Sequence, residues 1–468
     1  MSEDAWHAAR LIPTSGINGA DEQERRATSA LLAVIAAVKE FGRAITDRIG
    51  APSGAIECFV EIPFEVGDRK VFPDGLIRIR RGQRAWTALV EVKTGANQLQ
   101  REQLECYLDI AREHGFDALL TISHEIPASP GMHPTEVDRR KLRKVALHHL
   151  SWTQVLTDAV MQKMHRGVAD PDQAWILGEL IRYLEHPRSG AMEFDDMGGS
   201  WVAVRNAVRA GTLRNSDPGV IEVGGRWDQL IRYTCLRLGR QLGTEVQPVL
   251  SRKELTDPSL RVQNLLEGLV TNGVLEGSAR IPHAVAPVRL SADLRTSQVS
   301  ASITINAPRE GRPMTRVNWL LRQLKEAPEG VRIDAYALHS RISTSALLKD
   351  VRDKPTLLIT DSKRELKAFT ITLTAPMGIK RGGGRGSFVI SVLDLLDRFY
   401  ESIVQSLRPW SAPAPKLRKP EGEDVEQTPL SSTALSSQDG PELPEAVRLT
   451  AVQGAAAVSG LTLHTTAK

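Results

Sequence analysis

The chain lacks most of the features that mark secreted and membrane proteins. Its 468 residues include only three cysteines, Cys58, Cys106 and Cys235, which are widely spaced. This odd, sparse set argues against a disulfide scaffold, and no Cys/His cluster has the spacing of a zinc site. No apolar run approaches the roughly 20 residues needed to cross a bilayer, and no signal-peptide pattern opens the sequence. These absences predict a soluble, cytoplasmic protein without a membrane partner.

Neither sign of charge dominates the sequence. There are 60 Lys and Arg against 56 Asp and Glu, a net charge of +4. The segment from Ser411 onward carries five basic and seven acidic residues, so the residues before it carry a net +6. Such a mild excess is compatible with an anionic polymer as partner but does not require one. A Ser/His/Asp hydrolase has no support, because no Gly-x-Ser-x-Gly motif is present.

Length and composition predict several globular parts. The chain is 41% hydrophobic and too long for one ordinary domain. Changes in pattern predict a flexible N-terminus (1–20), an α/β domain (21–165), a helical region (166–278), a C-terminal α/β domain (279–410) and a disordered tail (411–468). The tail is rich in Pro, Ser, Thr and Ala and has no sustained apolar periodicity.

The first domain is predicted to be mixed α/β with the element order αβββαβαβ. Leu31, Ile35, Val38 and Phe41 recur at helical spacing, which predicts one long helix from Asp21 to about Ile49. The elements expected after it are strands at 55–66, 71–80 and 85–93, a helix at 97–114, a strand at 116–123, a helix at 133–146 and a strand at 145–152.

The rest of the chain is predicted from the same patterns. Helices are expected at 171–186, 198–212, 225–242 and 258–272. The C-terminal domain is expected to contain strands at 284–294, 298–306, 331–338, 356–360 and 367–374 and helices at 314–327, 343–352 and 387–407.

Three charged residues of the first domain form a candidate catalytic group. Asp74 follows Pro73 at the start of one predicted strand, and Glu91 and Lys93 point to the same face of the next. Asp74 and Glu91 could converge as oxygen ligands for Mg²⁺ or Mn²⁺, with Lys93 orienting water or stabilising negative charge. The alternative is an exposed Glu–Lys pair and a turn aspartate. The apolar residues beside Glu91 weaken that alternative, because they indicate a buried strand.

Two helices could complete this group. Glu24 lies at the start of the apolar stripe of the first helix, so it could reach the metal or could form a capping box with Asp21 at the N-cap. Gln103 lies inside the apolar stripe of another helix, with Tyr107 one turn later. A buried Gln needs hydrogen-bond partners, and a role in the backbone network is an alternative to a catalytic one.

The segment from about Asp21 to Trp152 resembles the PD-(D/E)xK nuclease superfamily, with its restriction-endonuclease-like fold. The matching motif is Pro73-Asp74 followed by Glu91-Val92-Lys93, and the Gln103-x-x-x-Tyr107 spacing is similar to that of RecB-like exonucleases. The resemblance implies that Asp74, Glu91 and the carbonyl of Val92 hold Mg²⁺ and that Lys93 is catalytic. It further implies that Glu24 assists the metal, while Gln103 and Tyr107 support the site or contact DNA. No RecB-type helicase motif accompanies these residues.

Two basic segments are further candidates for binding nucleic acid. Arg140 and Lys144 belong to a predicted basic helix face that could follow a DNA backbone or simply be solvated. Lys380, Arg381 and Arg385 lie in a glycine-rich loop before a helix expected to start at Ser387. That loop could hold phosphate or be merely flexible. His124, His148 and His149 have no further ligand at useful spacing and are expected to be structural.

These patterns together predict metal-dependent hydrolysis of DNA, in repair or in defence against foreign DNA. The alternative is a nuclease-like fold that serves as a nucleic-acid-binding or interaction module in a larger assembly. A protein partner could then bind through the C-terminal domain or the tail.

Overall fold

The computed structural model describes residues 7–8 and 20–412, apart from 68, 96, 128–131, 192, 341 and 362. Almost all of the predicted N-terminal segment and tail therefore lie outside the described residues. The described residues form a mixed α/β structure with two large sheets. Among their helices, none is both long and apolar enough to cross a membrane.

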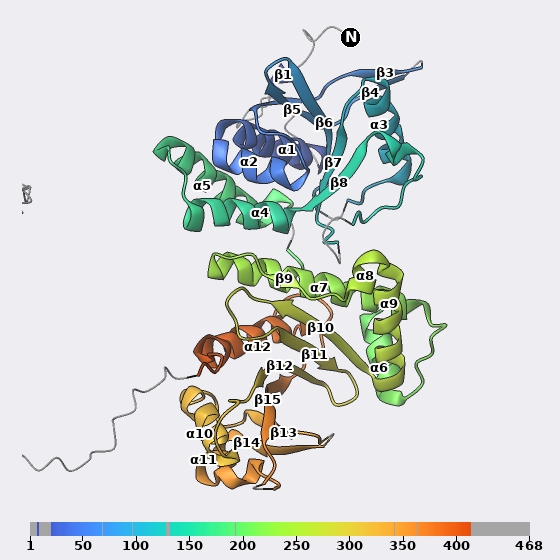
Figure 1. Cartoon of the computed structure of the whole chain (residues 1–468). Helices are drawn as coiled ribbons and strands as arrows, with labels where there is room; N and C mark the ends of the chain where they lie inside the picture. Colours follow the sequence, from blue (N-terminus) through green and yellow to red (C-terminus); the bar gives the residue numbers. More distant parts are fainter. Residues whose placement is uncertain are drawn as a thin grey trace, which may run out of the picture. The chain divides into compact units, whose positions relative to one another are not determined.

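The first sheet has six strands and is of mixed type (Figure 1). Its order is β1-β2-β5-β6-β7-β8, in which β2, β5 and β6 are antiparallel while β6, β7 and β8 are parallel. The strands are β1 (His7–Ala8), β2 (Ala55–Val60), β5 (Gly75–Arg81), β6 (Arg84–Val92), β7 (Ala118–Ser123) and β8 (Ala146–Ser151). A small hairpin of β3 (Phe64–Val66) and β4 (Arg69–Val71) lies between β2 and β5 in the chain.

Helices cover both faces of this sheet. Helices α1 (Ala20–Ala37), α2 (Lys39–Arg48), α4 (Trp152–Val160) and α5 (Pro171–Glu185) share one apolar cluster with strand residues such as Val90. Helix α3 (Arg101–Glu113) packs on the opposite face, where Leu104 belongs to a cluster with Leu89. Adjacent residues of β6 thus serve opposite cores, as the alternation of a strand requires.

The long N-terminal helix of the prediction is two helices. The backbone of Val38 is extended, with φ −101° and ψ 99°, and separates α1 from α2. The break brings Gly42 against the carbonyl oxygen of Ile35, where an added Cβ would lie 2.1 Å away. The predicted stripe is nevertheless fully buried, because both helices turn the same face toward the sheet.

The helix predicted at 133–146 is wrong, and only a short 3₁₀ turn, Lys141–Arg143, occurs there. The connection from β7 to β8 is held instead by a chain of hydrogen bonds around Thr121. The ring of His133 contacts the backbone of Thr135 through Nδ1 and forms a hydrogen bond with Thr121 Oγ1 through Nε2, at 2.8 Å. The Thr121 hydroxyl then donates to Nδ1 of His149, whose Nε2–H donates to the carbonyl of Glu125. The connection is therefore held by side-chain hydrogen bonds, whereas a helix would be held by packing of an apolar stripe.

The second sheet is antiparallel throughout. Its order is β14-β13-β15-β12-β11-β10-β9. The strands are β9 (Gln247–Pro248), β10 (Val274–Arg280), β11 (Val288–Asp293), β12 (Gln298–Asn306), β13 (Arg332–Ala337), β14 (Ser343–Leu347) and β15 (Leu366–Pro376). The helices of this part are α6 (Trp201–Ala210), α7 (Pro218–Leu242), α8 (Arg252–Thr256), α9 (Pro258–Glu267), α10 (Pro313–Gln323), α11 (Leu348–Asp353) and α12 (Phe388–Ser402).

Helices and sheet of this part share one apolar core. Trp201 of α6 lies 4.3 Å from Phe388 of α12 between ring centroids, and Trp227 of α7 contacts the same ring at 6.1 Å. The same cluster continues to Ile303 and Ile371 on the sheet. The boundary predicted at residue 278 falls within β10.

Two C-terminal predictions are wrong. The helix expected at 343–352 begins as strand β14, because Ser345 bonds across to Asp334 of β13 and residues 343–347 pair with that strand. The strand expected at 356–360 is largely a 3₁₀ turn, Pro355–Leu358, which begins with a proline that has no N–H for a ladder. The helix expected at 258–272 is confirmed in extent, because α9 (Pro258–Glu267) continues as a π-helical turn, Gly268–Asn272.

The buried histidine chain predicts a loss of stability in acid. Burial lowers the pKa of His149 to about 3, against about 6.5 in an unfolded chain. The unfolded state therefore binds one more proton between these values, and the free energy of unfolding falls as the pH drops through that window. We expect a loss of about 1.4 kcal/mol per pH unit from this residue. Urea unfolding of the parent and of His149→Phe should show a shallower acid dependence for the variant, and parallel curves would contradict the assignment.

Candidate active site

A row of polar side chains crosses the first sheet at one level. In the strand registers Glu91 lies beside Thr121, and Thr121 lies beside His149. Gly75 pairs with Val90, so Asp74 reaches the same level as Glu91 from the start of β5. The row follows the apolar residues Leu89, Leu119 and Leu147 by two positions on each strand, so it lies on the face that α3 covers.

Asp74 is held in place by the backbone on both sides of it. The N–H of Val92 donates to Asp74 Oδ2 at 2.7 Å, and the carbonyl of Asp74 accepts from Glu61. Gly75 follows directly, and an added Cβ there would lie 2.4 Å from Leu32 Cδ1 and 3.0 Å from the carbonyl oxygen of Phe59. Only glycine lets β5 start this close to α1, and this close approach sets where Asp74 lies.

Glu91 is an acidic side chain in the interior of the protein. It is 1% exposed, and its Oε1 lies 2.7 Å from Lys93 Nζ. Among the described residues Lys93 is the one donor near its oxygens, and the carboxyl of Asp74 lies beside it as an acceptor. Burial first, and then the charge of Asp74, raise the pKa of Glu91 well above its usual value. Burial likewise raises the pKa of Asp74 to about 6, although the Val92 N–H and Lys93 oppose the rise.

Lys93 lies between two carboxylates. Its Nζ is 2.7 Å from Glu91 and 2.9 Å from Glu24 Oε1, and its side chain is 13% exposed. Trp152 Nε1 donates to the Lys93 carbonyl at 2.9 Å, which fixes the backbone after β6. Burial is the largest single influence and would lower the pKa of Lys93, but Glu91, Asp74 and Glu24 together outweigh it, so the pKa is raised. The amine is therefore an ammonium ion at neutral pH and can donate hydrogen bonds but cannot act as a base.

Glu24 reaches this site from the first turns of α1. Its carboxylate pairs with Lys93, whereas Glu22 pairs with Arg26 of its own helix. Asp21 lies inside the helix, which begins at Ala20, so it is not the N-cap that a capping box requires. Glu24 therefore forms an ion pair with Lys93 of the site and not a capping box with Asp21.

Gln103 and Tyr107 support the segment that carries Asp74. Gln103 Nε2 donates to Tyr107 Oη at 3.0 Å, and the Tyr107 hydroxyl donates to the carbonyl of Phe72 at 3.4 Å. Tyr107 is 3% exposed, and burial together with the charge of Glu91 raises its pKa. Its position favours a supporting role over direct contact with a polymer.

The residues present fit a hard divalent cation in part. Asp74 and Glu91 supply two adjacent carboxyl groups whose pKa values are raised chiefly by burial, and a cation would stabilise their ionised forms. The carbonyl of Val92, directly after Glu91 in the chain, could supply a third oxygen. Within the described ranges, no group of three His, Cys, Asp or Glu side chains is arranged to hold a metal. The donor set is therefore two carboxylates and backbone, with Glu24 engaged by Lys93.

Two features of the site have little signal in the sequence. Trp152 opens α4, and its only sequence signal is a large aromatic residue directly after a strand. A turn at 187–190 docks on the site, since Gly95 N–H donates to the Gly190 carbonyl at 2.9 Å and Gln23 Nε2 to that of Arg188 at 2.7 Å. Nothing in the sequence links that turn to Lys93.

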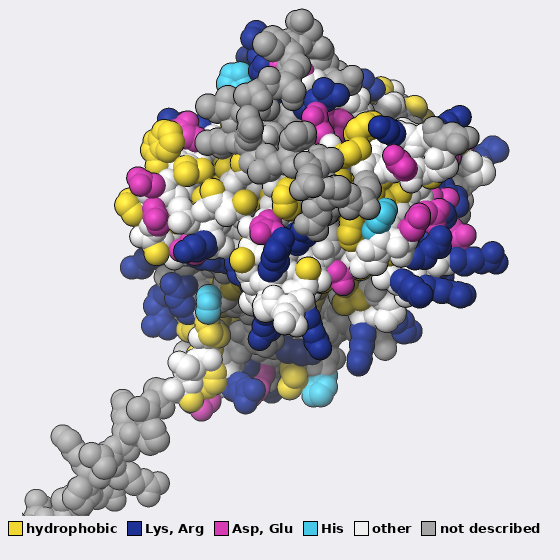
Figure 2. All heavy atoms as spheres, turned by 90° about the horizontal axis from the view of Figure 1, so that it is seen from above, with side chains coloured by type: hydrophobic (Ala, Val, Ile, Leu, Met, Phe, Trp, Pro, Cys, Tyr) yellow, Lys and Arg dark blue, Asp and Glu magenta, His cyan; other side chains and the backbone are white. Residues whose placement is uncertain are grey.

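Among the described residues, the predicted basic segments form no ion pair with Asp74 or Glu91. Arg140 and Lys144 are exposed beside the short 3₁₀ turn. Figure 2 shows Lys and Arg side chains in several groups on the face drawn there, without one continuous patch.

The glycine-rich loop belongs to the second sheet. Lys380, Arg381 and Arg385 precede α12, whose N-cap is Ser387 as the prediction of a helix start there requires. Arg381 pairs with Asp196 at 3.5 Å, and Asp195 lies beside Gly383. These carboxylates reduce the attraction of the loop for phosphate. Within the described part of the chain, no hydrogen bond or ion pair joins the loop to Asp74, Glu91 or Lys93.

The docked turn gives a test of what positions the site. Gly190 has φ +80°, and an added Cβ would lie 2.7 Å from Thr94 Cβ and 2.8 Å from Gln23. Gly211 has φ +68° with no atom near its missing Cβ, so Gly211→Ala carries the strain without the clash. We expect Gly211→Ala to cost about 1 kcal/mol in urea unfolding and Gly190→Ala clearly more. Equal losses of unfolding free energy in the two variants would show that the turn is not packed tightly against the site.

Comparison of the chain with protein-family models, with curated proteins and with solved structures gives no match.

Proposed function

We propose that this chain is a metal-dependent nuclease of the PD-(D/E)xK type that hydrolyses DNA phosphodiester bonds, and that the first sheet is a restriction-endonuclease-like core. The observation that carries the proposal is the convergence of Asp74, Glu91 and Lys93. A buried glutamate next to a second carboxyl is costly to keep for stability alone. A cation and a phosphate would make use of the arrangement. Repair and defence against foreign DNA are the processes in which such an activity would serve.

The side chains can be given separate roles in this reaction. Asp74 and Glu91 would hold Mg²⁺ or Mn²⁺ together with the Val92 carbonyl. The bound ion would polarise the phosphoryl oxygen and lower the pKa of water. Lys93 is charged, so it would donate a hydrogen bond to the oxygen on which negative charge develops. Glu24 would hold the ammonium of Lys93 in position, and Tyr107 would hold the backbone before Asp74.

The competing function is binding without catalysis, as an interaction module of a larger assembly. A pure binder of nucleic acid gains nothing from two carboxylates near a phosphate, because they repel it. The partial neutralisation of Glu91 and Glu24 by Lys93 is the observation that keeps this alternative open.

Lys93→Ala should separate the two functions. It should abolish DNA cleavage in Mg²⁺ or Mn²⁺ while leaving DNA affinity within about tenfold, because the lost contact stabilises the transition state more than the bound substrate. Cleavage should be measured on linear, circular, single-stranded and duplex DNA, and affinity by fluorescence anisotropy. Lys349→Ala, which removes an exposed lysine of the second sheet's α11, is the matched control.

Two results would decide against the enzyme. If Lys93→Ala cuts DNA as well as the parent, the activity resides elsewhere or in a contaminant. If the parent binds DNA but cuts none of the four substrates with either metal, the interaction module is the better account.

Metal binding can be measured without activity. A ligand that binds only the native state raises the stability by about 2.7 kcal/mol at a hundred times its dissociation constant. We therefore expect Mg²⁺ or Mn²⁺ to raise the melting temperature of the parent but not of Asp74→Asn. Glu22→Gln, which removes a carboxylate of α1 that pairs with Arg26, should respond to metal like the parent. A similar rise in all three proteins would show that the ion binds at another place.

A further inference from the structure

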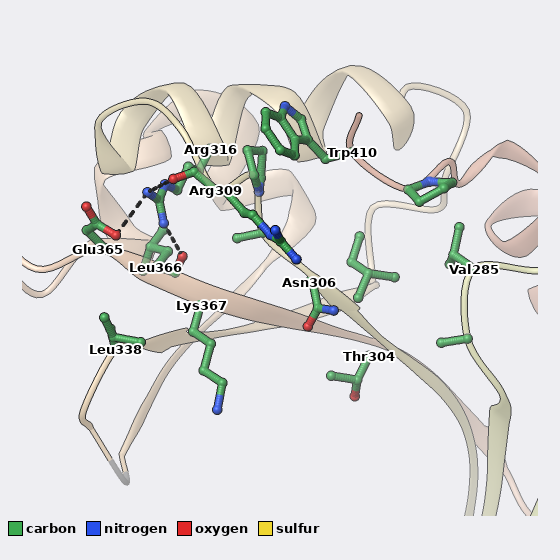
Figure 3. A pocket seen from close by; sticks show the side chains of 15 residues that line it. Val285, Thr304, Asn306, Arg309, Arg316, Leu338, Glu365, Leu366, Lys367 and Trp410 are labelled. Atoms are coloured by element: carbon green, nitrogen blue, oxygen red, sulfur yellow. Dashed lines mark hydrogen bonds and ion pairs between the residues drawn. The ribbon is translucent and has the colours of Figure 1, made fainter. Parts of the chain in front are cut away.

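The second sheet carries a groove that the proposed reaction does not use. It lies where β12 ends and β15 begins, and its volume is about 560 Å³. Its wall contains Thr304 and Asn306 from β12, Arg309 from the following loop, Lys367 from β15 and Trp410 near the end of the described chain (Figure 3). A groove of this size accommodates a ligand of a few tens of atoms.

One wall of the groove is held rigid by a buried arginine. The guanidinium of Arg316 in α10 is 4% exposed and donates to the carbonyls of Gly311, Arg309 and Leu366 at 2.6–3.0 Å. Its fourth partner is Glu365 at 3.2 Å. These bonds tie the loop that carries Arg309 to the start of β15, so the groove is a built feature of the fold.

The charges along the groove are unbalanced. Arg309 and Lys367 are exposed, and within the described ranges neither forms an ion pair with an acidic side chain. Glu365 is the acidic residue of the lining, and it is already engaged by Arg316. In Figure 3, Arg309 extends from its loop toward Asn306. Two cations without acidic partners in one groove attract an anion, and the amide of Asn306 adds a neutral polar group to the lining.

An aromatic ring completes the lining. Trp410 is half-buried, and the segment before it is fixed because the Arg408 N–H donates to Gln323 Oε1 at 2.6 Å. An indole in the lining of the same groove offers a stacking surface for a planar ring, and the side-chain amide of Asn306 can both donate to and accept from the edge of such a ring.

We propose that this groove binds a nucleoside phosphate, either free or as one unit of an unpaired nucleic-acid strand. Arg309 and Lys367 hold the phosphate, and Trp410 stacks on the base. Asn306 bonds the base edge. The proposal does not depend on the activity assigned to the first sheet, because none of these residues belongs to that site.

The test is binding in metal-free buffer with a chelator, so that cleavage plays no part. A fluorescein-labelled oligothymidylate is titrated with the full-length chain, and unlabelled AMP and inorganic phosphate are used as competitors. Arg309→Ala, Lys367→Ala and Trp410→Ala should each weaken the oligonucleotide by about tenfold, whereas Trp410→Phe should lose less because a ring remains. Lys349→Ala, which removes an exposed charge outside the groove, should bind like the parent. Unchanged melting temperatures establish that the variants fold.

The outcomes distinguish the source of the ligand. Strong competition by AMP supports a free nucleotide, and weak competition with tight oligonucleotide binding supports a strand. Competition by inorganic phosphate equal to that by AMP would overturn recognition of the nucleoside. The proposal would be overturned if neither the oligothymidylate nor AMP binds. It would also be overturned if the Arg309 and Lys367 variants bind as the parent does. Loss of oligonucleotide binding in these variants together with normal cleavage by the parent would leave the nuclease proposal intact.

Discussion

The site depends on the burial of acidic groups beside a single lysine. The ammonium of Lys93 lies within 3 Å of Glu91 and Glu24, and Glu91 is also in contact with the carboxyl of Asp74. One positive charge cannot neutralise three carboxylates, and burial, more than their mutual charge, raises the pKa values of Asp74 and Glu91. A divalent cation has the charge that would restore balance. Electrostatics therefore connects the fold of this sheet to its proposed chemistry.

The surrounding structure keeps these groups from moving apart. Asp74 is fixed by the Val92 N–H on one side and by the close approach of Gly75 to Leu32 on the other. On the far side of Glu91 the polar row continues into Thr121, whose hydroxyl links two histidines and holds the connection from β7 to β8 without a helix. Repulsion between carboxylates would otherwise relax by displacement of a strand end. The hydrogen bonds on both sides of β6 prevent that displacement.

Local patterns in the sequence predict much of this arrangement, and long-range bonds account for the rest. The buried stripe of α1 and α2 and the shared face of Glu91 and Lys93 follow from helical and strand periodicity, so they could be predicted from single segments. The break at Val38 could not be predicted in this way, because it is accompanied by the close approach of Gly42 to the carbonyl oxygen of Ile35, seven residues earlier. The false helix at 133–146 has the same origin, since His133 bonds to Thr121 on a different element. The docking of Gly190 on Gly95 joins residues 95 positions apart and leaves no trace in either segment.

The charge state of Lys93 limits the ways in which this site could act. A lysine that takes a proton from water must be neutral near pH 7, which requires burial without nearby carboxylates. Lys93 is largely but not fully buried, and Glu91 and Glu24 hold the proton on it. In the proposed hydrolysis, the proton of an attacking water would therefore have to go to another group, and Asp74, with a pKa of about 6, is the closest in strength to what that task needs. A ligand role and a proton-accepting role compete for the same carboxyl. The bound cation would resolve that competition, because it lowers the pKa of its own water and leaves Asp74 free to remain a ligand.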